Sequence, residues 1–408
     1  MKSFLQVIIV AFIFISFLLS LPNLTKERNF KTYKDEQLRA TAQSKGLKPI
    51  PNTYEELLKI ANDENNPLNH EKIALGKELF FDTKLSLDDT ISCSTCHMIS
   101  KNQNEKKVIL NAITSKKQPN DMKNANNCVV CHLSDESGTD RLSTAIGYKG
   151  TTNPYHLNTM TILNSSLAKQ FTWSGEVKTL EEQISNSIQA PHKMNIKEDD
   201  LIKKLLEDEK YINSFNTVFK EENSLSFINI QKAIASYVKT LLTRSSFDEF
   251  LEGDNSAISA TAKRGLVNFM NFGCSGCHTG MSVGGQSVQR FPLRHFAGIH
   301  DLRPNLGSPP DFEIIDDTFP FENKGGYKGR ANTQFFRVPI LRNVTKTSPY
   351  FHNGSVDKIR EAVEIMGRHQ VGLNLSNQQI DEIVEFLKTL EGNIVDYTHE
   401  AKDTKANK

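Results

Sequence analysis

The longest apolar stretch of the chain is at its N-terminus, where residues 4–21 follow Lys2 and are almost wholly apolar. As a helix this stretch would be about 27 Å long, close to the thickness of the hydrocarbon core of a bilayer. Residues 1–21 are therefore predicted to be an export signal or a membrane anchor. Because bulky side chains at 17–19 occupy the place of a small-x-small cleavage pair, the uncleaved anchor is favoured. The polar residues 22–50 predict a tether.

Two later segments share one helical pattern. Gly76 stands four residues before Phe80, and Gly265 stands four residues before Phe269. A glycine on a helix lets another helix approach closely, and the aromatic ring four residues later can pack against a large planar group. An internal repeat of this kind argues for two similar domains.

Capping boxes and apolar faces predict further helices. Ser376 to Gln379 and Thr179 to Glu182 have the capping-box pattern. The apolar face that follows the first of these boxes continues until Gly392, where we expect the helix to end. Helical patterns also occupy residues 201–219 and 228–242. The pattern as a whole predicts a mainly α fold with long irregular loops.

Composition adds bounds to this picture. The chain has 408 residues, of which 38% are hydrophobic and 24% charged, and is long enough for two domains with real cores. Its 49 basic and 48 acidic residues give a net charge of +1. The overall charge therefore gives no reason to expect nucleic-acid binding. Six cysteines are too few for a disulfide scaffold of this size.

All six cysteines lie in Cys-x-x-Cys-His units. The three units are Cys93, Cys96 and His97; Cys128, Cys131 and His132; and Cys274, Cys277 and His278. Two thiols at this spacing add across the two vinyl groups of a haem, and the adjacent histidine becomes the proximal iron ligand. A redox dithiol would not need that histidine three times, and no cysteine remains for a four-thiolate zinc site. The sequence predicts three covalently bound c-type haems, attached after export to a bacterial periplasm.

The haem motifs indicate which kind of domain the repeated helices belong to. The helices before the first and last motifs fit the first helix of a cytochrome c fold, so we expect cytochrome c-like domains at 51–245 and 246–400. Residues 98–127 are rich in Lys and Asn and contain no amphipathic helix leading into the middle motif. The middle haem is therefore predicted to lie in an insertion at 98–137.

The chain resembles the bacterial dihaem cytochrome c peroxidases and the related methylamine-utilisation dihaem enzymes. The resemblance runs from about Leu75 to Leu390, apart from the insertion. Its phrases are Leu75–Asp82, Thr161–Asn164, Phe171–Gly175, Leu180–Gln183, Val338–Asn343, Pro349–Gly354 and Ala362–Met366.

This resemblance implies a division of labour between the two domains. The haem on His97 would bind peroxide, and the haem on His278 would be a high-potential relay with Met366 as its sixth ligand, since a thioether raises haem potential. The helical pattern around Met366 alone also allows plain core packing. Trp173, the only tryptophan, matches a residue between the two haems, although core packing is the commoner role of tryptophan.

Further roles follow from the same resemblance. Gln183 matches a glutamine that orients peroxide. Asn158, Thr347 and Pro349 fall at the positions of an interdomain calcium site, where amide and carbonyl oxygens suit a hard cation.

The chain departs from the family pattern at the group that moves protons during peroxide cleavage. The family uses a glutamate in a Pro-x-Glu-Met phrase, and here Lys193 stands in its place. An ammonium donates a proton but accepts none at pH 7 unless burial lowers its pKa. The neighbouring His192 is either a proton shuttle or a solvated loop residue.

A second departure concerns the peroxide face, where the family holds a resting-state histidine shortly after an Ile-Gly pair. Here Tyr148 follows the pair, and the only histidine of the loop is His156. Either His156 swings in, or Tyr148 lines the pocket, or the site is already open. The sixth ligand of the middle haem is equally open among His70, Met122 and His156.

The leading hypothesis is a periplasmic three-haem peroxidase that reduces hydrogen peroxide to water. Its electron donor would be a small c-type cytochrome or a membrane quinol, with a homodimer possible and no nucleic acid involved. Two alternatives are a multihaem electron-transfer protein without peroxidase activity, which Lys193 favours, and an enzyme that oxidises residues of a partner protein.

Overall fold

The computed structural model describes residues 33–100, 137–296 and 314–397. The predicted export helix and the middle haem motif lie outside these ranges. No helix within them is long and apolar enough to cross a membrane. Helices α3 to α16 all belong to one compact unit, Arg39–Lys408.

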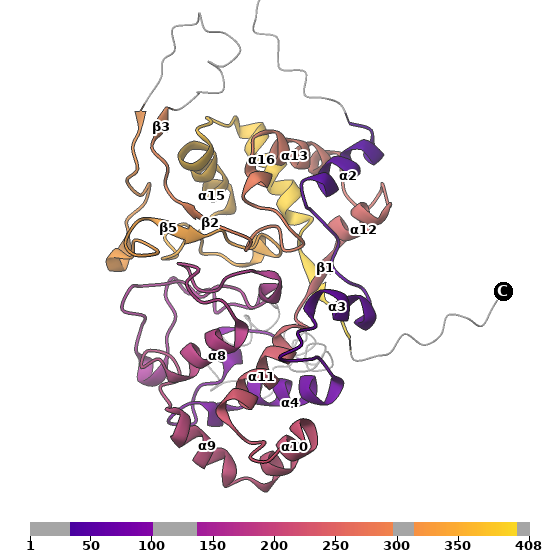
Figure 1. Ribbon diagram of the computed structural model, residues 1–408. Helices are drawn as coiled ribbons and strands as arrows, with labels where there is room; N and C mark the ends of the chain where they lie inside the picture. Colours follow the sequence, from indigo (N-terminus) through magenta and orange to yellow (C-terminus); the bar gives the residue numbers. More distant parts are fainter. Residues whose placement is uncertain (1–32, 101–136, 297–313, 398–408) are drawn as a thin grey trace, which may run out of the picture. The chain divides into compact units, whose positions relative to one another are not determined.

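Helices make up most of the regular structure, as predicted (Figure 1). They are α2 (Asp35–Ser44), α3 (Tyr54–Ala61), α4 (His70–Phe81), α5 (Cys93–Cys96), α8 (Leu180–Gln189), α9 (Glu198–Leu206), α10 (Glu209–Phe219), α11 (Phe227–Val238), α12 (Ser246–Glu252), α13 (Ala260–Asn271), α15 (Ile359–Met366) and α16 (Asn377–Lys388). The described strands pair into short antiparallel ribbons, namely β1 (Thr243–Ser245) with β6 (Gly392–Ile394), β2 (Val288–Arg290) with β5 (Phe335–Arg337), and β3 (His295–Phe296) with β4 (Ile314–Ile315).

Helix α4 packs against α11 before the first haem motif, and α8 packs on α11 as well. Helices α4 and α11 cross at Gly76, where an added Cβ would lie 1.8 Å from the carbonyl oxygen of Ala233. One turn later, Phe80 meets the ring of Tyr237 edge-on at 5.4 Å. A side chain at position 76 would therefore separate the helices.

The same arrangement recurs before the last motif, where α13 lies beside α16 (Figure 1). An added Cβ on Gly265 would lie 1.8 Å from the carbonyl oxygen of Glu382. Phe269 then packs against Phe386, with ring centroids 5.2 Å apart. The close helix crossing that each glycine was predicted to allow is thus confirmed in both copies.

Three predicted helix bounds are wrong, and the first is that of α11, which ends at Val238 and not at residue 242. Helix α16 begins at the predicted capping box but ends at Lys388, because Gly392 pairs with Ser245 as the first residue of β6. The pattern at 201–219 forms two helices rather than one, because the Asp208 carboxylate caps a new helix at the amide of Lys210.

The centre of the unit is a hydrogen-bonded junction on Thr243, which is fully buried. Asn164 and Asn343 each donate their side-chain amide to Thr243 Oγ1 at 2.9 Å. The Asn164 carbonyl oxygen accepts from the amide of Thr243 at 2.9 Å, and that of Asn343 accepts from Gly392 at 2.7 Å. Both asparagines have left-handed backbone with φ of 59°. Two turns that are distant in sequence are thereby fixed to the same ribbon, which β1 and β6 form at the centre of the unit.

A buried ion pair stabilises the segments around this ribbon. Arg342 and Asp248 are both fully buried, and the guanidinium donates twice to the carboxylate, at 2.7 and 2.8 Å. Asp248 also accepts from the amides of Ile50 and Ser245, each at 2.8 Å. The paired geometry and these extra bonds offset the cost of removing both charges from water.

Candidate haem and peroxide site

The first Cys-x-x-Cys-His motif lies on α5, a single helical turn that begins after Ser92. The thiols of Cys93 and Cys96 are free, and burial raises the pKa of each to about 12. Nδ1 of His97 lies 3.2 Å from the carbonyl oxygen of Gly138. Burial lowers the pKa of His97 to about 4, so the ring is neutral, as a metal ligand must be. A histidine held in this way presents Nε2 to a metal.

The last motif has the same thiols and a buried histidine, but Nδ1 of His278 has no hydrogen-bond partner among the described residues. Cys274 and Cys277 are free thiols, and burial lowers the pKa of His278 to about 4. The ring of Phe269 lies 6.3 Å from that of His278, next to where a haem would attach. Met366 is the last residue of α15 and is half-buried, and its ligation of the relay haem stays a prediction.

Arg337 has the surroundings expected of a partner for an anionic group. It is 5% exposed, its Nε donates to the carbonyl of Thr172 at 3.2 Å, and its Nη2 contacts the sulfur of Met160. Its Nη1 is buried and has no hydrogen-bond partner among the described residues. Burial lowers the pKa of this guanidinium to about 10. A buried cation without a carboxylate is costly, and a haem propionate would remove that cost.

Lys193, at the position of the family glutamate, lies beside the first motif. Its charge lowers the pKa of both the Cys96 thiol and the His97 ring, which places the ammonium close to them. Burial in turn lowers the pKa of Lys193. Its Nζ lies 3.5 Å from Ser187 Oγ, which accepts from Gln183 Nε2 at 3.3 Å. Gln183 Oε1 is buried without a partner in the described part of the chain, so a polar cluster with an open acceptor lies next to the motif.

His192 extends this cluster towards the loop that follows the insertion. Its Nε2 lies 3.3 Å from Nδ2 of Asn153, and burial lowers its pKa. Gly147 permits the close approach, because a Cβ there would lie 2.1 Å from the carbonyl oxygen of His192. Burial thus favours the uncharged form of this imidazole.

The same loop contains both candidates for the peroxide face. The amide of Tyr148 donates to the carbonyl of Lys193 at 2.7 Å, and the carbonyl of Ile146 lies 4.0 Å from the sulfur of Cys96. His156 has left-handed backbone with φ of 50°. Its Nε2 is buried and lacks a hydrogen-bond partner within the described ranges. Tyr148 is thus beside Lys193, while His156 carries the unpartnered ring nitrogen.

Trp173 meets a residue that the sequence reasoning missed, His352. Their rings are 6.4 Å apart in a T-shaped arrangement. The Trp173 indole donates to the carbonyl of Asn158 at 2.9 Å, and the amide of Asn158 donates to the carbonyl of His352 at 2.8 Å. Burial lowers the pKa of His352 to about 4.

A second internal repeat explains this pairing and would have revealed it. Trp173 stands nine residues after Asn164 and two before Gly175, and His352 has the same spacing from Asn343 and from the glycine that follows. The two residues therefore occupy equivalent places on equivalent turns. The asparagines of these turns are the pair that meets at the central ribbon.

The predicted calcium ligands lie near the same turns. Asn158 is bonded to the backbone of His352, as described above, and is 8% exposed. A Cβ on Gly354 would lie 3.0 Å from Pro349, which brings the Pro349 segment against this turn. The hydroxyl of Thr347 donates to the carbonyl of Val344 at 3.0 Å. Calcium binding stays a prediction.

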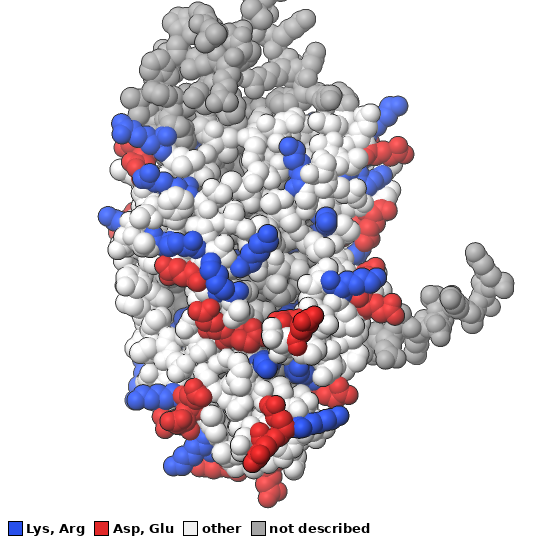
Figure 2. Space-filling view, viewed as in Figure 1, with Lys and Arg blue, Asp and Glu red and all other residues white. Residues whose placement is uncertain are grey.

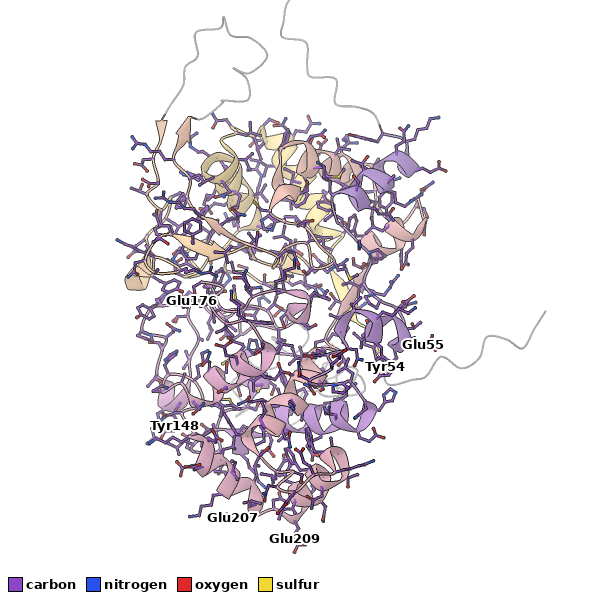
Figure 3. All side chains as sticks on the ribbon, viewed as in Figure 1. Tyr54, Glu55, Tyr148, Glu176, Glu207 and Glu209 are labelled. Carbon is purple, nitrogen blue, oxygen red and sulfur yellow. The ribbon has the colours of Figure 1, made fainter. Side chains whose placement is uncertain are left out.

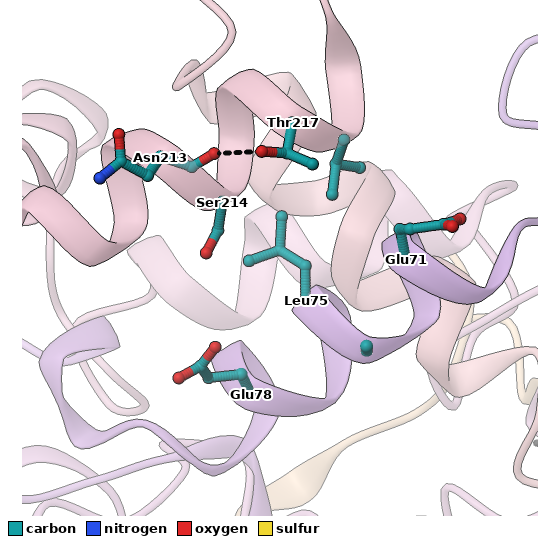
Figure 4. A pocket seen from close by; sticks show the side chains of 8 residues that line it. Glu71, Leu75, Glu78, Asn213, Ser214 and Thr217 are labelled. Atoms are coloured by element: carbon teal, nitrogen blue, oxygen red, sulfur yellow. Dashed lines mark hydrogen bonds between the residues drawn. The ribbon is translucent and has the colours of Figure 1, made fainter.

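One pocket of the described structure lies apart from this site. A pocket of about 340 Å³ between α4 and α10 is lined by Glu71, Ala74, Leu75, Glu78, Asn213, Ser214, Thr217 and Val218 (Figure 4). Its lining includes no cysteine, histidine or aromatic ring. Basic and acidic side chains are interspersed on the face drawn in Figure 2, in keeping with the net charge of +1.

Two paired-thiol histidine motifs on repeated helices define a haem-binding redox protein. Residues 70–126 and 121–256 match the family model described as "Di-haem cytochrome c peroxidase". The chain is 31% identical over 351 residues to the cytochrome c551 peroxidase of Pseudomonas aeruginosa, a match that covers 85% of this chain and 84% of that protein. The chain belongs to the di-haem cytochrome c peroxidase family, and it is a peroxidase-like oxidoreductase with covalently bound haem.

Other relatives are more distant. The methylamine utilization protein MauG of Methylorubrum extorquens is 26% identical over 363 residues, covering 86% of this chain and 87% of that one. Among solved structures, a MauG-like protein associated with microbial copper homeostasis has a TM-score of 0.60 at 24% identity, covering 85% and 94% of the two chains. The diheme peroxidase BthA from Burkholderia thailandensis has a TM-score of 0.55 at 16% identity, covering 81% and 88%. These structures share the fold.

Proposed function

We propose that this chain is a periplasmic three-haem peroxidase that reduces hydrogen peroxide to water. The observation that carries this proposal is the cluster of Gln183, Ser187 and Lys193 beside His97, since it sets an unpartnered acceptor and a proton donor next to a haem motif. The names of the relatives, cytochrome c peroxidases, support the same reaction.

The chain's own residues would handle the protons. Reduction of one peroxide consumes two electrons and two protons and yields two waters. A haem held by His97 would supply the iron at which peroxide is reduced and would pass on electrons from the donor. Gln183 accepts a hydrogen bond from the peroxide and orients it. Lys193 donates a proton to the departing oxygen, which the burial of its charge favours, and His192 restores that proton.

The remaining assignments concern the relay. His278 and Met366 would hold a second haem, with Trp173 and its contact to His352 between the two motifs. The division into domains at 51–245 and 246–400, with calcium held by Asn158, Thr347 and Pro349 at their junction, belongs to this proposal.

Delivery of electrons completes the proposal. The donor would be a small c-type cytochrome or a membrane quinol, and the haem on Cys128, Cys131 and His132 would lengthen the path from it. An N-terminal anchor would hold the protein at the inner membrane, and the protein would function alone or as a homodimer.

The test is peroxide turnover by the half-reduced holoprotein with a reduced small cytochrome as donor. Lys193→Met should lower turnover by about 100-fold, the scale of a lost general acid, whereas Lys193→Glu should retain or raise it. Lys197→Met is the matched control, since Lys197 is an exposed lysine four residues away, and it should leave turnover within about twofold. Unchanged turnover in Lys193→Met would remove the proton role of this residue.

A second candidate is a multihaem electron-transfer protein, favoured by the lysine in place of the glutamate. The spin state separates the two candidates. A high-spin or vacant haem after partial reduction supports the peroxidase, whereas permanently six-coordinate low-spin haems support the electron carrier.

A further inference from the structure

A continuous row of rings leads from Trp173 to the protein surface. Trp173 lies 6.4 Å from His352, His352 lies 6.1 Å from Tyr327, and Tyr327 lies 5.5 Å from Tyr155, measured between ring centroids. Tyr155 is 54% exposed, so the last ring of the row is open to solvent.

The row is held rigidly in place. His352 Nε2 lies 2.7 Å from Asn323 Oδ1, and Asn323 Nδ2 donates to the carbonyl of Tyr327 at 3.0 Å. Gly325 brings this loop directly against Tyr155, because a Cβ there would lie 2.3 Å from the Tyr155 carbonyl oxygen. Both contacts of Tyr327 are therefore fixed by the backbone as well as by ring packing.

The members of the row differ in chemistry. Indole and phenol groups are the side chains that most readily lose one electron, and a phenol loses a proton at the same time. Tyr327 is half-buried and hydrogen-bonds with Ser174. Burial and the charge of Glu176, which is labelled in Figure 3, raise the pKa of the Tyr327 phenol. The ring of His352 stacks on Phe336 at 4.8 Å and fills the space between the indole and the phenol.

Core packing does not account for the end of the row. Aromatic rings in a core exclude water, and a tyrosine that is more than half exposed contributes little to that. Its place at the end of a row that begins at the only tryptophan of the chain points to a role in electron transfer.

We propose that Tyr155 is a surface oxidation site at which small phenolic reductants give electrons to the peroxide site through Tyr327 and Trp173. The inference rests on the proposed peroxide reduction. Each phenol ArOH gives up one electron and one proton and becomes the radical ArO•. The balance is H₂O₂ + 2 ArOH → 2 H₂O + 2 ArO•, in which peroxide is the oxidant and the O–O bond is broken.

The experiment compares two donors on the holoprotein treated with hydrogen peroxide, guaiacol as a small phenol and a reduced small cytochrome. Tyr155→Phe and Tyr327→Phe retain the rings but remove the oxidisable phenol. Each should lower guaiacol oxidation by about tenfold or more and leave cytochrome oxidation within about twofold. Tyr54→Phe is the matched control, because Tyr54 is a partly exposed tyrosine on α3 outside the row (Figure 3).

A second readout does not depend on turnover. A nitroso spin trap added with peroxide should label Tyr155, as located by peptide mass spectrometry, and the label should disappear in Tyr327→Phe. Absence of the label from Tyr155 in the unsubstituted protein overturns the inference, as does guaiacol oxidation that Tyr155→Phe does not change. Labelling of Tyr155 without cytochrome oxidation would support the inference and contradict the cytochrome donor of the proposed function.

Discussion

At the scale of single residues, the site contains several of the buried polar atoms that lack partners among the described residues. Arg337 Nη1, Gln183 Oε1 and His156 Nε2 are all buried without hydrogen bonds among the described residues. Such atoms are rare in folded proteins because each costs free energy. Their positions around the first motif and its junction with the C-terminal half are what a protein evolved to hold a polar cofactor and substrate should show.

The first prediction at this scale concerns Arg337. Arg337→Met should lower the free energy of unfolding of the holoprotein by about 3–5 kcal/mol, since it leaves a haem propionate buried without its cation. Denaturant unfolding measures this loss. Arg290→Met is the control, because Arg290 forms an exposed pair with Asp317 and its loss should cost about 0–1 kcal/mol. A neutral or stabilising Arg337→Met would mean that no anion binds there.

At the scale of elements, the same helix crossing is built twice. In each copy a glycine contacts a carbonyl of the partner helix, and the phenylalanine four residues later meets an aromatic ring four residues beyond that carbonyl. The crossing precedes a haem motif in both copies, so the position of each motif depends on how closely two helices approach.

A methyl group at the crossing tests this dependence. Gly265→Ala should lower the free energy of unfolding by at least about 1–3 kcal/mol, because the added Cβ overlaps the carbonyl of Glu382. The urea midpoint gives the measurement. Asn271→Ala, at an exposed position on the same helix and outside the haem motif, should shift the midpoint little. Equal midpoints for the two variants would contradict the close crossing.

How far the sequence predicts the structure depends on whether the signal is local. The Ser376 capping box predicted the start of α16 because the bonds involved span three residues. The end of α16 was mispredicted because Gly392 pairs with β1, which is distant in sequence. His352 was missed for the same reason, since its contact with Trp173 joins turns far apart in the chain. The motifs on α5 and after α13 needed no such information.

At the scale of the whole molecule, the proposed chemistry needs two haems of different potential. The thioether of Met366 would raise the potential of the haem on His278, while the first haem keeps a site for peroxide. Trp173 and His352, which the proposal sets between the two motifs, come one from each half of the repeat. Electron transfer between the halves would therefore pass through a contact that neither half forms alone.

A redox titration tests the relay. Met366→Leu should lower the potential of one haem by on the order of 100 mV, since axial ligands set haem potentials over about 0.8 V, and leave the others unchanged. Met270→Leu provides the comparison, because Met270 is a buried methionine on α13 outside the proposed ligand set. An unaltered titration of Met366→Leu would exclude this sixth ligand.

The hydroxyl of Thr243 has a further consequence. Its two acceptor sites are taken by Asn164 and Asn343, one from each copy of the repeated turn. A duplicated element usually brings its own partners, yet here both copies share one oxygen on a residue that belongs to neither. Thr243→Val would remove this hydrogen-bond acceptor from both copies at once, whereas Thr243→Ser would keep it for both. Sequence change in one half of the molecule is thus constrained by the other half, because both depend on a single oxygen atom.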